Sequence, residues 1–82
     1  MTTLFLDGRA YATPHAYHLA LKRLLHLPDY YGCTADALYD CLAERAAPVN
    51  VWVYHPGEGE TAIALRRTLR VFEDLDGQVR CL

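Results

Sequence analysis

The stretch Val49-Asn-Val-Trp-Val-Tyr54 decides the fold, because it is the strongest candidate for a central β-strand in this 82-residue chain. Its β-branched and aromatic residues favour the pleated, half-buried surface of a sheet. A shorter apolar run, Thr3-Leu-Phe-Leu6, ends at the turn signal Asp7-Gly8 and predicts a first strand. After a second turn signal, Asp76-Gly77, residues Gln78–Leu82 predict a short last strand.

A first helix is expected before the central strand. Thr13 is placed to cap it and Pro14 suits the first helical position, and helix formers continue to Leu25. Pro28 would stop this helix, and Tyr30-Tyr31-Gly32 would form a compact loop. The apolar residues expected to face the core are Ala16, Leu19, Ala20 and Leu24.

Two further helices are expected. Thr34 suits the N-cap of the second and Thr61 that of the third. For the second helix, the inward face would consist of Ala37, Leu38, Cys41 and Leu42. For the third helix, it would consist of Ala62, Leu65, Leu69 and Phe72.

The order strand, helix, helix, strand, helix, strand predicts an α/β fold, in which right-handed crossovers build a small parallel sheet with helices packed on it. The Ala46-Ala47-Pro48 segment would separate the second helix from the central strand. At this length the chain is expected to form a single domain, residues 1–82, without repeats or linkers.

Composition bounds the class of protein. An apolar fraction of 52% with 22% charged residues is typical of a globular protein and too hydrophobic for intrinsic disorder. No apolar run approaches the roughly 20 residues that span a bilayer, and no signal peptide is evident, so we expect a cytoplasmic protein with no membrane partner. The cysteines Cys33, Cys41 and Cys81 are expected to be reduced, at least two of them buried and inert.

Acidic side chains gather in and before the second helix. Between residues 29 and 44 there is no basic residue to balance the four acidic ones, and the first basic residue after them is Arg45. The acidic residues are Asp29, Asp36, Asp40 and Glu44. Asp36 and Asp40 stand four residues apart, so both carboxylates point the same way on a helix, at a cost of roughly 0.2–0.5 kcal/mol. Asp36 would regain roughly 0.3–1 kcal/mol from the helix dipole, which fades before Asp40. Asp40 is therefore the carboxylate that helix energetics explain least.

Catalytic and metal chemistry find little support. The chain has no phosphate-binding loop, and Asp36 and Asp40 would stand side by side with no evident nucleophile or cleft. His15 and His18 share a helix face, yet no second ligand pair of recognised spacing follows, so partly exposed histidines without a metal are expected. We expect no cofactor and no enzymatic activity; a small hydrolase using the two carboxylates is the weakest of three hypotheses.

Three tyrosines surround the acidic residues. Exposed tyrosines beside charges are common anchors of protein interfaces, and Tyr30 and Tyr39 are expected to serve in this way, whereas Tyr31 is expected to pack internally. The surrounding negative charge argues against direct binding of nucleic acid. A basic cluster on the third helix is interpreted as a solvated face; its members are Arg66, Arg67 and Arg70.

The segment Leu27-Pro-Asp-Tyr-Tyr-Gly32, followed by Asp36-Ala-Leu-Tyr-Asp-Cys-Leu42, resembles the barstar family of intracellular inhibitors of secreted ribonucleases such as barnase. About half of the chain is covered, with weaker support from the first two strands and Val71-Phe72. The resemblance implies a barstar-like two-layer fold, in which a three-stranded parallel sheet packs against about three to four helices.

The resemblance also implies a binding mode. In barstars the loop and the acidic helix plug the active site of the ribonuclease, and an aspartate takes the place of a substrate phosphate. Asp40 matches that aspartate, Tyr30 a tyrosine that packs on the catalytic histidine, and Asp36 a second acidic contact. Gly32 matches a backbone contact and Tyr39 an interface tryptophan. A fixed carboxylate on a rigid helix suits a cationic cleft that binds RNA.

Several positions depart from the pattern of the family. Arg45 stands where barstars have a further interface tryptophan, and Cys33 and Thr34 stand where they have glutamate and asparagine. Asp74 matches one acidic residue of the last helix and Asp76 stands in approximately for another, but the three arginines make this helix basic overall. The partner can therefore differ from barnase itself.

The leading hypothesis is a protein inhibitor of a ribonuclease or a related cationic toxin, which would be neutralised in a complex between two proteins. The residues expected to bind the partner are Tyr30, Gly32, Asp36, Tyr39, Asp40 and Asp74. The alternative is a barstar-like binding or immunity domain for a partner that is not a nuclease, an idea motivated by the arginine-rich helix. In either case the free protein is expected to be a monomer.

Overall fold

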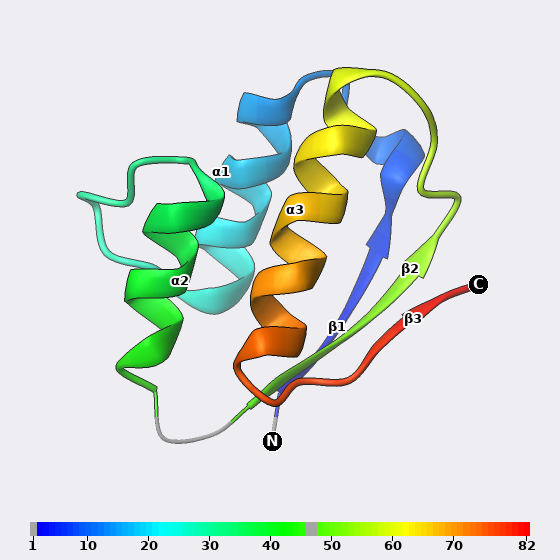
Figure 1. The fold of residues 1–82 in the computed structure, drawn as a ribbon. Helices are drawn as coiled ribbons and strands as arrows, with labels where there is room; N and C mark the ends of the chain where they lie inside the picture. The colour runs from blue at the N-terminus through cyan, green and yellow to red at the C-terminus, as the bar shows by residue number, and fades with distance from the viewer. Residues whose placement is uncertain (1, 46–47) are drawn as a thin grey trace.

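The structure, a computed structural model, describes residues 2–45 and 48–82. Its elements follow the predicted order (Figure 1), and three of them are α-helices within the described residues. Along the chain they are β1 (Thr2–Asp7), a 3-10 turn η1 (Gly8–Ala10), α1 (Pro14–Leu25), α2 (Ala35–Ala43), β2 (Val49–Tyr54), α3 (Glu60–Asp74) and β3 (Val79–Cys81). Of the predicted Ala46-Ala47-Pro48 break, residues 46 and 47 lie outside the described part.

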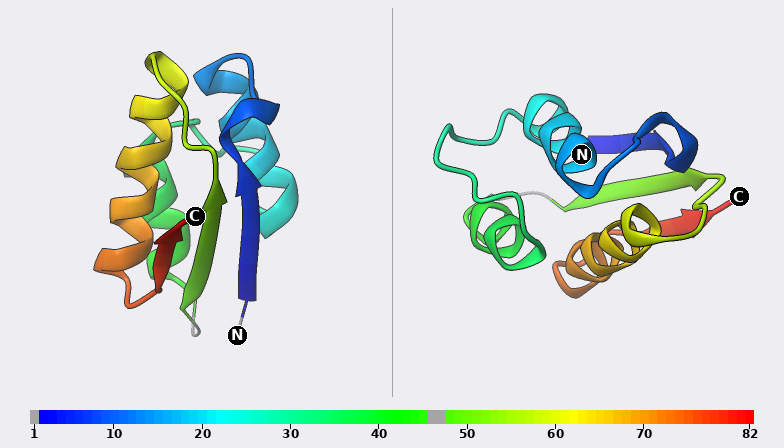
Figure 2. Two further views of the ribbon diagram at one scale, coloured as in Figure 1. Left: turned by 90° about the vertical axis from the view of Figure 1, so that its right-hand side faces the viewer. Right: turned by 90° about the horizontal axis from the view of Figure 1, so that it is seen from above.

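The three strands form one parallel sheet in the order β1-β2-β3, so the prediction of a central strand at Val49–Tyr54 is confirmed. The helices lie together on one side of this sheet, which gives a two-layer α/β fold (Figure 2). Because side chains alternate between the faces of a strand, every second residue enters the core. The buried strand residues are Leu4, Leu6, Val49, Val51 and Val53.

Helix α1 has the predicted bounds and cap. The Thr13 hydroxyl accepts a hydrogen bond from the backbone N–H of Ala16 at 3.1 Å, and Pro14 occupies the first turn. The helix ends before Pro28 is reached, because His26 adopts a left-handed conformation, with φ of 53°, that caps the last carbonyls.

The predicted inward face of α1 is wrong by one position. Leu19 and Leu24 are exposed, and Ala16 and Ala20 are half-buried. The residues that α1 buries are instead Tyr17, His18, Leu21 and Leu25. The cause lies in two polar groups that find partners inside the protein. The Tyr17 hydroxyl lies 2.6 Å from the Thr68 hydroxyl, and His18 bonds to a tyrosine described below.

Helix α3 begins two residues earlier than predicted. Its N-cap is Gly59, with φ of 86° and no side-chain hydrogen bond, so the expected cap at Thr61 is wrong. Thr61 already lies within the first turn, because the chain leaves the preceding loop through the glycine in a conformation that other residues rarely adopt. The inward face is as predicted, since Ala62, Leu65, Leu69 and Phe72 are all buried.

Gly77 joins α3 to the sheet at a point of close contact. A Cβ atom at this position would overlap the carbonyl oxygens of Val49 and Phe72. The Gly77 N–H donates to that Phe72 oxygen at 2.8 Å, which holds the turn in place. A residue without a side chain is therefore required for β3 to reach its position beside β2.

The cysteines differ from the prediction that at least two are buried. Cys33 and Cys41 are half-buried and Cys81 is exposed, and all three are free. Cys33 belongs to a surface loop, Cys41 to the boundary of the inward face of α2, and Cys81 to the end of an edge strand. Within residues 2–45 and 48–82, no helix has the length and apolar character to cross a membrane.

Candidate protein-binding site

The loop between α1 and α2 is anchored at two buried side chains and presents a third outward. Leu27 and Tyr31 are buried, and the Tyr31 N–H donates to the Pro28 carbonyl at 3.0 Å. Lys22 of α1 forms an ion pair with Asp29 of the loop, at 3.5 Å between Nζ and Oδ1. Tyr30, between these anchors, is 80% exposed. The loop therefore holds a large aromatic side chain in solvent on a fixed backbone.

The inner anchor is a hydrogen bond between Tyr31 and His18. The Tyr31 hydroxyl lies 2.6 Å from Nδ1 of His18, and both side chains are buried. Burial raises the pKa of the Tyr31 hydroxyl, while burial, aided by the charge of His15, lowers the pKa of His18. Both groups are thus neutral near pH 7. The internal position predicted for Tyr31 is confirmed, and the partial exposure predicted for His18 is wrong.

Helix α2 turns an apolar face inward and an acidic one outward. The Thr34 hydroxyl accepts from the N–H of Ala37 at 3.1 Å, which confirms the predicted N-cap. Leu38 and Leu42 are buried. The outward residues are Asp36, Tyr39, which is 45% exposed, and Asp40. We call Asp36, Tyr39, Asp40 and Tyr30 the acidic face.

The two aspartates of the acidic face have no partner in the described structure. The ion pairs found within residues 2–45 and 48–82 involve Asp7 and Asp29, and neither Asp36 nor Asp40 accepts a side-chain hydrogen bond there. Their charges therefore face solvent together on one side of a short helix, the situation predicted from their spacing.

The backbone conformation at Gly32 does not require a glycine. It is exposed, its φ is not positive, and a Cβ atom built on it would make an ordinary contact of 3.6 Å with the Ala37 Cβ. The unusual backbone falls on the next residue, Cys33, with φ of 54°. The missing side chain at Gly32 leaves backbone open beside Tyr30, as a backbone contact would require.

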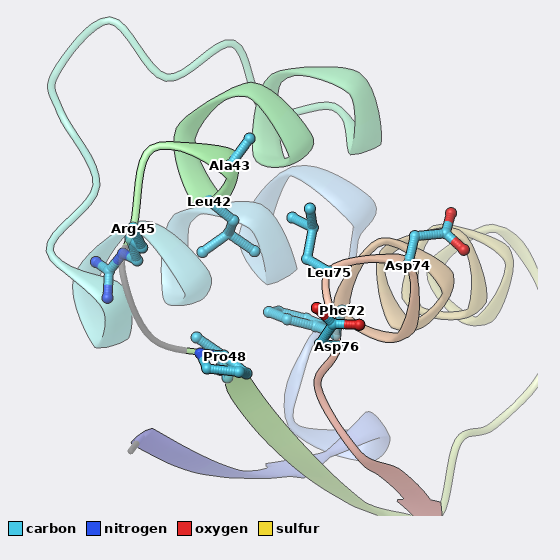
Figure 3. Close-up of a pocket in the computed structure, with 9 residues that line it drawn as sticks. Leu42, Ala43, Arg45, Pro48, Phe72, Asp74, Leu75 and Asp76 are labelled. Carbon is cyan, nitrogen blue, oxygen red and sulfur yellow. The ribbon is translucent and has the colours of Figure 1, made fainter.

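Asp74 stands apart from the other predicted residues. It is exposed and ends α3, and it lines a pocket of about 210 Å³ between the C-terminal ends of α2 and α3. Figure 3 shows Asp74 at the rim opposite Arg45, with Leu42 and Phe72 between them. The structure thus joins Tyr30, Gly32, Asp36, Tyr39 and Asp40 in one continuous segment and leaves Asp74 at the end of a neighbouring helix.

Arg45 turns toward α1. Its guanidinium donates to the carbonyl of Leu25 at the C-terminal end of that helix, where a cation is favoured by the helix dipole. Arg45 consequently links the ends of α1 and α2. The sequence placed Arg45 at the edge of the acidic patch and at the position of an interface tryptophan of the family, but it did not predict this structural role.

The arginines of α3 form an exposed basic stripe. Arg66, Arg67 and Arg70 are exposed, as predicted, and make no ion pair with any described residue. Arg67 and Asp36 line opposite sides of a groove between the N-terminal halves of α3 and α2. This juxtaposition depends on the packing of the two helices, so the sequence alone gave no signal for it.

The remaining reactive groups are the Cys41 thiol and the side chains that could hold a metal ion. Burial, followed by the nearby charges of Glu44 and Asp40, raises the pKa of the Cys41 thiol, which disfavours the thiolate, as predicted from the neighbouring carboxylate. Among the described residues, no group of histidine, cysteine and acidic side chains is placed to hold a metal ion.

Comparison with known proteins agrees with this geometry. The family model described as "Barstar (barnase inhibitor)" matches residues 1–80. A relative from Bacillus subtilis (strain 168), named "Putative ribonuclease inhibitor YrdF", is 45% identical over 42 residues, which cover 51% of this chain and 46% of that protein. The match thus spans about half the length of the relative. The chain, with its three-stranded parallel sheet and its acidic second helix, belongs to the barstar (barnase inhibitor) family.

Proposed function

We propose that this protein is an inhibitor of a ribonuclease and that it binds the cationic active site of that enzyme through the acidic face. Family membership supports an inhibitor rather than an enzyme. The observation that carries the proposal is the pair of exposed, unpartnered carboxylates on α2, held next to the projecting Tyr30. A surface of this kind lacks only a cationic counterpart.

Asp40 acts in this proposal as the mimic of a substrate phosphate. A ribonuclease gathers cationic side chains where the phosphate of RNA binds, and these would form charge-assisted hydrogen bonds to a carboxylate. Asp40 lies in the second turn of a helix whose buried side fixes it to the core through Leu38 and Leu42. A carboxylate that is already positioned loses little conformational entropy on binding, and it offers no bond for the enzyme to cleave.

The other residues of the segment have supporting roles. Tyr30 supplies an exposed aromatic ring for an apolar contact near the catalytic centre, and Gly32 supplies open backbone. Asp36 and Tyr39 extend the contact along α2, while Asp74 lies at the far rim. Negative charge on α2 would also speed the encounter with a cationic cleft, so association should slow as salt rises.

The test is inhibition of purified ribonucleases, with barnase as the first probe and other bacterial ribonucleases beside it. Asp40→Ala is compared with Glu58→Ala, which removes the same charge from an exposed loop away from α2. Truncating one partner of a buried charge pair costs about 2–5 kcal/mol, so Asp40→Ala should weaken inhibition by roughly 30-fold or more. The Glu58 variant should inhibit like the parent.

Two results would contradict the proposal. In one, both variants inhibit as well as the parent, so that Asp40 has no part in binding. In the other, the parent inhibits none of the ribonucleases, although it is folded.

A second candidate function rests on the basic stripe of α3. Arg66, Arg67 and Arg70 lack partners among the described residues, and Arg67 shares a groove with Asp36. A partner that is not a nuclease, with acidic and basic patches side by side, would match both helices. Capture of such a partner by the parent, and its loss on replacing the three arginines with glutamine, would favour this function over ribonuclease inhibition.

A further inference from the structure

The sheet has one face that no element of the described chain covers. All three helices lie on one side, and Figure 2, left, looks onto the opposite side of the sheet. Parallel sheets occur almost only where both faces are covered, because their strands are usually apolar on both sides. An open parallel sheet with apolar residues on its free face is therefore a surface that another molecule should cover.

Aromatic side chains occupy this free face. Phe5 of β1 is 64% exposed, Tyr54 of β2 is 41% exposed, and Trp52 of β2 is half-buried. The ring centroids of Phe5 and Trp52 are 6.3 Å apart, and the guanidinium carbon of Arg80 lies 5.3 Å from the Trp52 ring. The strand register places Phe5, Trp52 and Arg80 side by side. We call these three residues the Trp52 row.

We propose that the free face of the sheet binds a second copy of this chain. A two-fold axis parallel to the strands, lying between two sheets about 10 Å apart, would place β1 of each copy opposite β3 of the other. Trp52 would then meet Trp52, and Phe5 of each copy would meet Arg80 of the other. At both ends of the interface, the guanidinium of Arg80 in one copy would thus lie against the Phe5 ring of the other copy.

The alternative symmetric arrangement is less favourable. A two-fold axis perpendicular to the strands would bring β3 of each copy together, and Arg80 would face Arg80. Like charges in such positions oppose association. The order of residues along the Trp52 row therefore selects the parallel axis.

The size of the face sets the strength of the contact. Three strands of six, six and three residues, spaced about 4.8 Å apart, give a face of roughly 240 Å² in projection. This is smaller than the roughly 800 Å² that each partner buries in a standard interface, so the dimer should be weak, with a dissociation constant on the order of 0.1–1 mM. The monomer expected from the sequence stays a prediction, which the experiment below also tests.

Two features separate this proposal from others. The acidic face lies on the helix layer, so dimerisation does not depend on the proposed inhibitor function. Single-stranded RNA could also stack on exposed aromatic rings, but Arg80 is the one cation of the Trp52 row, whereas nucleic-acid surfaces gather several. A second copy of this chain matches the Trp52 row better, because it would place Arg80 against Phe5 at one end of the row and Phe5 against Arg80 at the other.

The experiment is sedimentation equilibrium of the whole chain from 10 µM to 2 mM, paired with fluorescence of Trp52, which is the single tryptophan of the sequence. The parent should dimerise, and the emission of Trp52 should change along the same concentration curve. Phe5→Glu and Arg80→Glu should each weaken dimerisation about tenfold or more, because each change occurs twice in a symmetric interface. Ile63→Glu is the matched control on α3, where the side chain is 48% exposed, and should dimerise like the parent.

Every other outcome overturns the proposal. A parent that stays monomeric at 2 mM has no such interface. A dimer that persists in both the Phe5 and Arg80 variants, or that leaves Trp52 emission unchanged, uses a different surface. Quenching of Trp52 by a single-stranded oligouridylate, in a parent that does not dimerise, would assign the face to nucleic acid instead. Circular dichroism of each variant confirms that it is folded.

Discussion

Replacing Tyr31 with phenylalanine should destabilise the protein far more than the same change at Tyr30. The two residues are adjacent, but the Tyr31 hydroxyl forms a buried hydrogen bond of 2.6 Å to Nδ1 of His18, whereas Tyr30 is 80% exposed. Tyr31→Phe leaves a buried histidine nitrogen without a partner, at a cost of about 1–3 kcal/mol. Tyr30→Phe should change the free energy of unfolding by less than about 0.5 kcal/mol.

The assay is urea unfolding together with thermal unfolding of the parent and both variants. For a domain of this size, each kcal/mol lowers Tm by about 4–8 °C, so Tyr31→Phe should lower Tm by roughly 4 °C or more. Adding His18→Leu to Tyr31→Phe should restore part of the loss, because an apolar pair no longer leaves a polar group unsatisfied.

Equal stability of the two tyrosine variants would refute this reasoning. The hydrogen bond would then contribute nothing, and the anchoring of the loop would have to rest on its other contacts, such as the burial of Leu27 and of the Tyr31 ring. A double variant less stable than either single variant would likewise show that His18 and Tyr31 are not coupled through this bond.

Three further predictions concern pH, charge and backbone. The pKa of His18 is lowered in the folded protein, so at pH values below about 6.5 the unfolded chain binds more protons than the folded protein. The free energy of unfolding, measured in urea, should therefore fall as the pH drops from 6.5 toward the folded pKa of His18. Above pH 6.5, His18 should not contribute to the pH dependence of stability. Asp40→Asn should raise the free energy of unfolding by about 0.2–0.5 kcal/mol, because it removes the repulsion between residues 36 and 40. Asp36→Asn should gain less stability, because it also loses a favourable interaction with the helix dipole. An equal gain in both variants, measured by calorimetry at low salt, would contradict this assignment. Gly77→Ala should lower the free energy of unfolding by more than about 1 kcal/mol, because the new Cβ atom would overlap the Val49 carbonyl. Gly32→Ala should leave the midpoint of unfolding nearly unchanged, because a Cβ atom fits there. A similar loss of stability in both variants would contradict this difference.

Much of the fold could be predicted because its signals are local. The alternation within Val49–Tyr54 identifies the central strand, and Thr13 and Thr34 begin the first two helices through bonds to backbone only three residues away. The sequence also predicted that Tyr31 packs internally and that Tyr30 is exposed, and the structure confirms both positions.

The errors involve side chains whose partners lie far along the chain. The predicted inward face of α1 did not include Tyr17 and His18, whose polar groups have partners inside the protein, namely Thr68 and Tyr31. The free face of the sheet was likewise not apparent, because alternation shows that a strand has two faces and not which of them the helices cover. Both the inward face of α1 and the free face of the sheet are determined by contacts between residues that lie far apart in the sequence.

The most direct test of the inhibitor proposal is whether a nucleotide and this protein compete for one site on the ribonuclease. The dissociation constant of the complex would be measured by calorimetry with increasing amounts of a nucleoside 3′-monophosphate, the simplest ligand that carries the substrate phosphate. If Asp40 takes the place of that phosphate, the apparent dissociation constant should rise in proportion to nucleotide concentration. A dissociation constant that does not change at saturating nucleotide would show that the acidic face binds elsewhere, and would contradict the proposal.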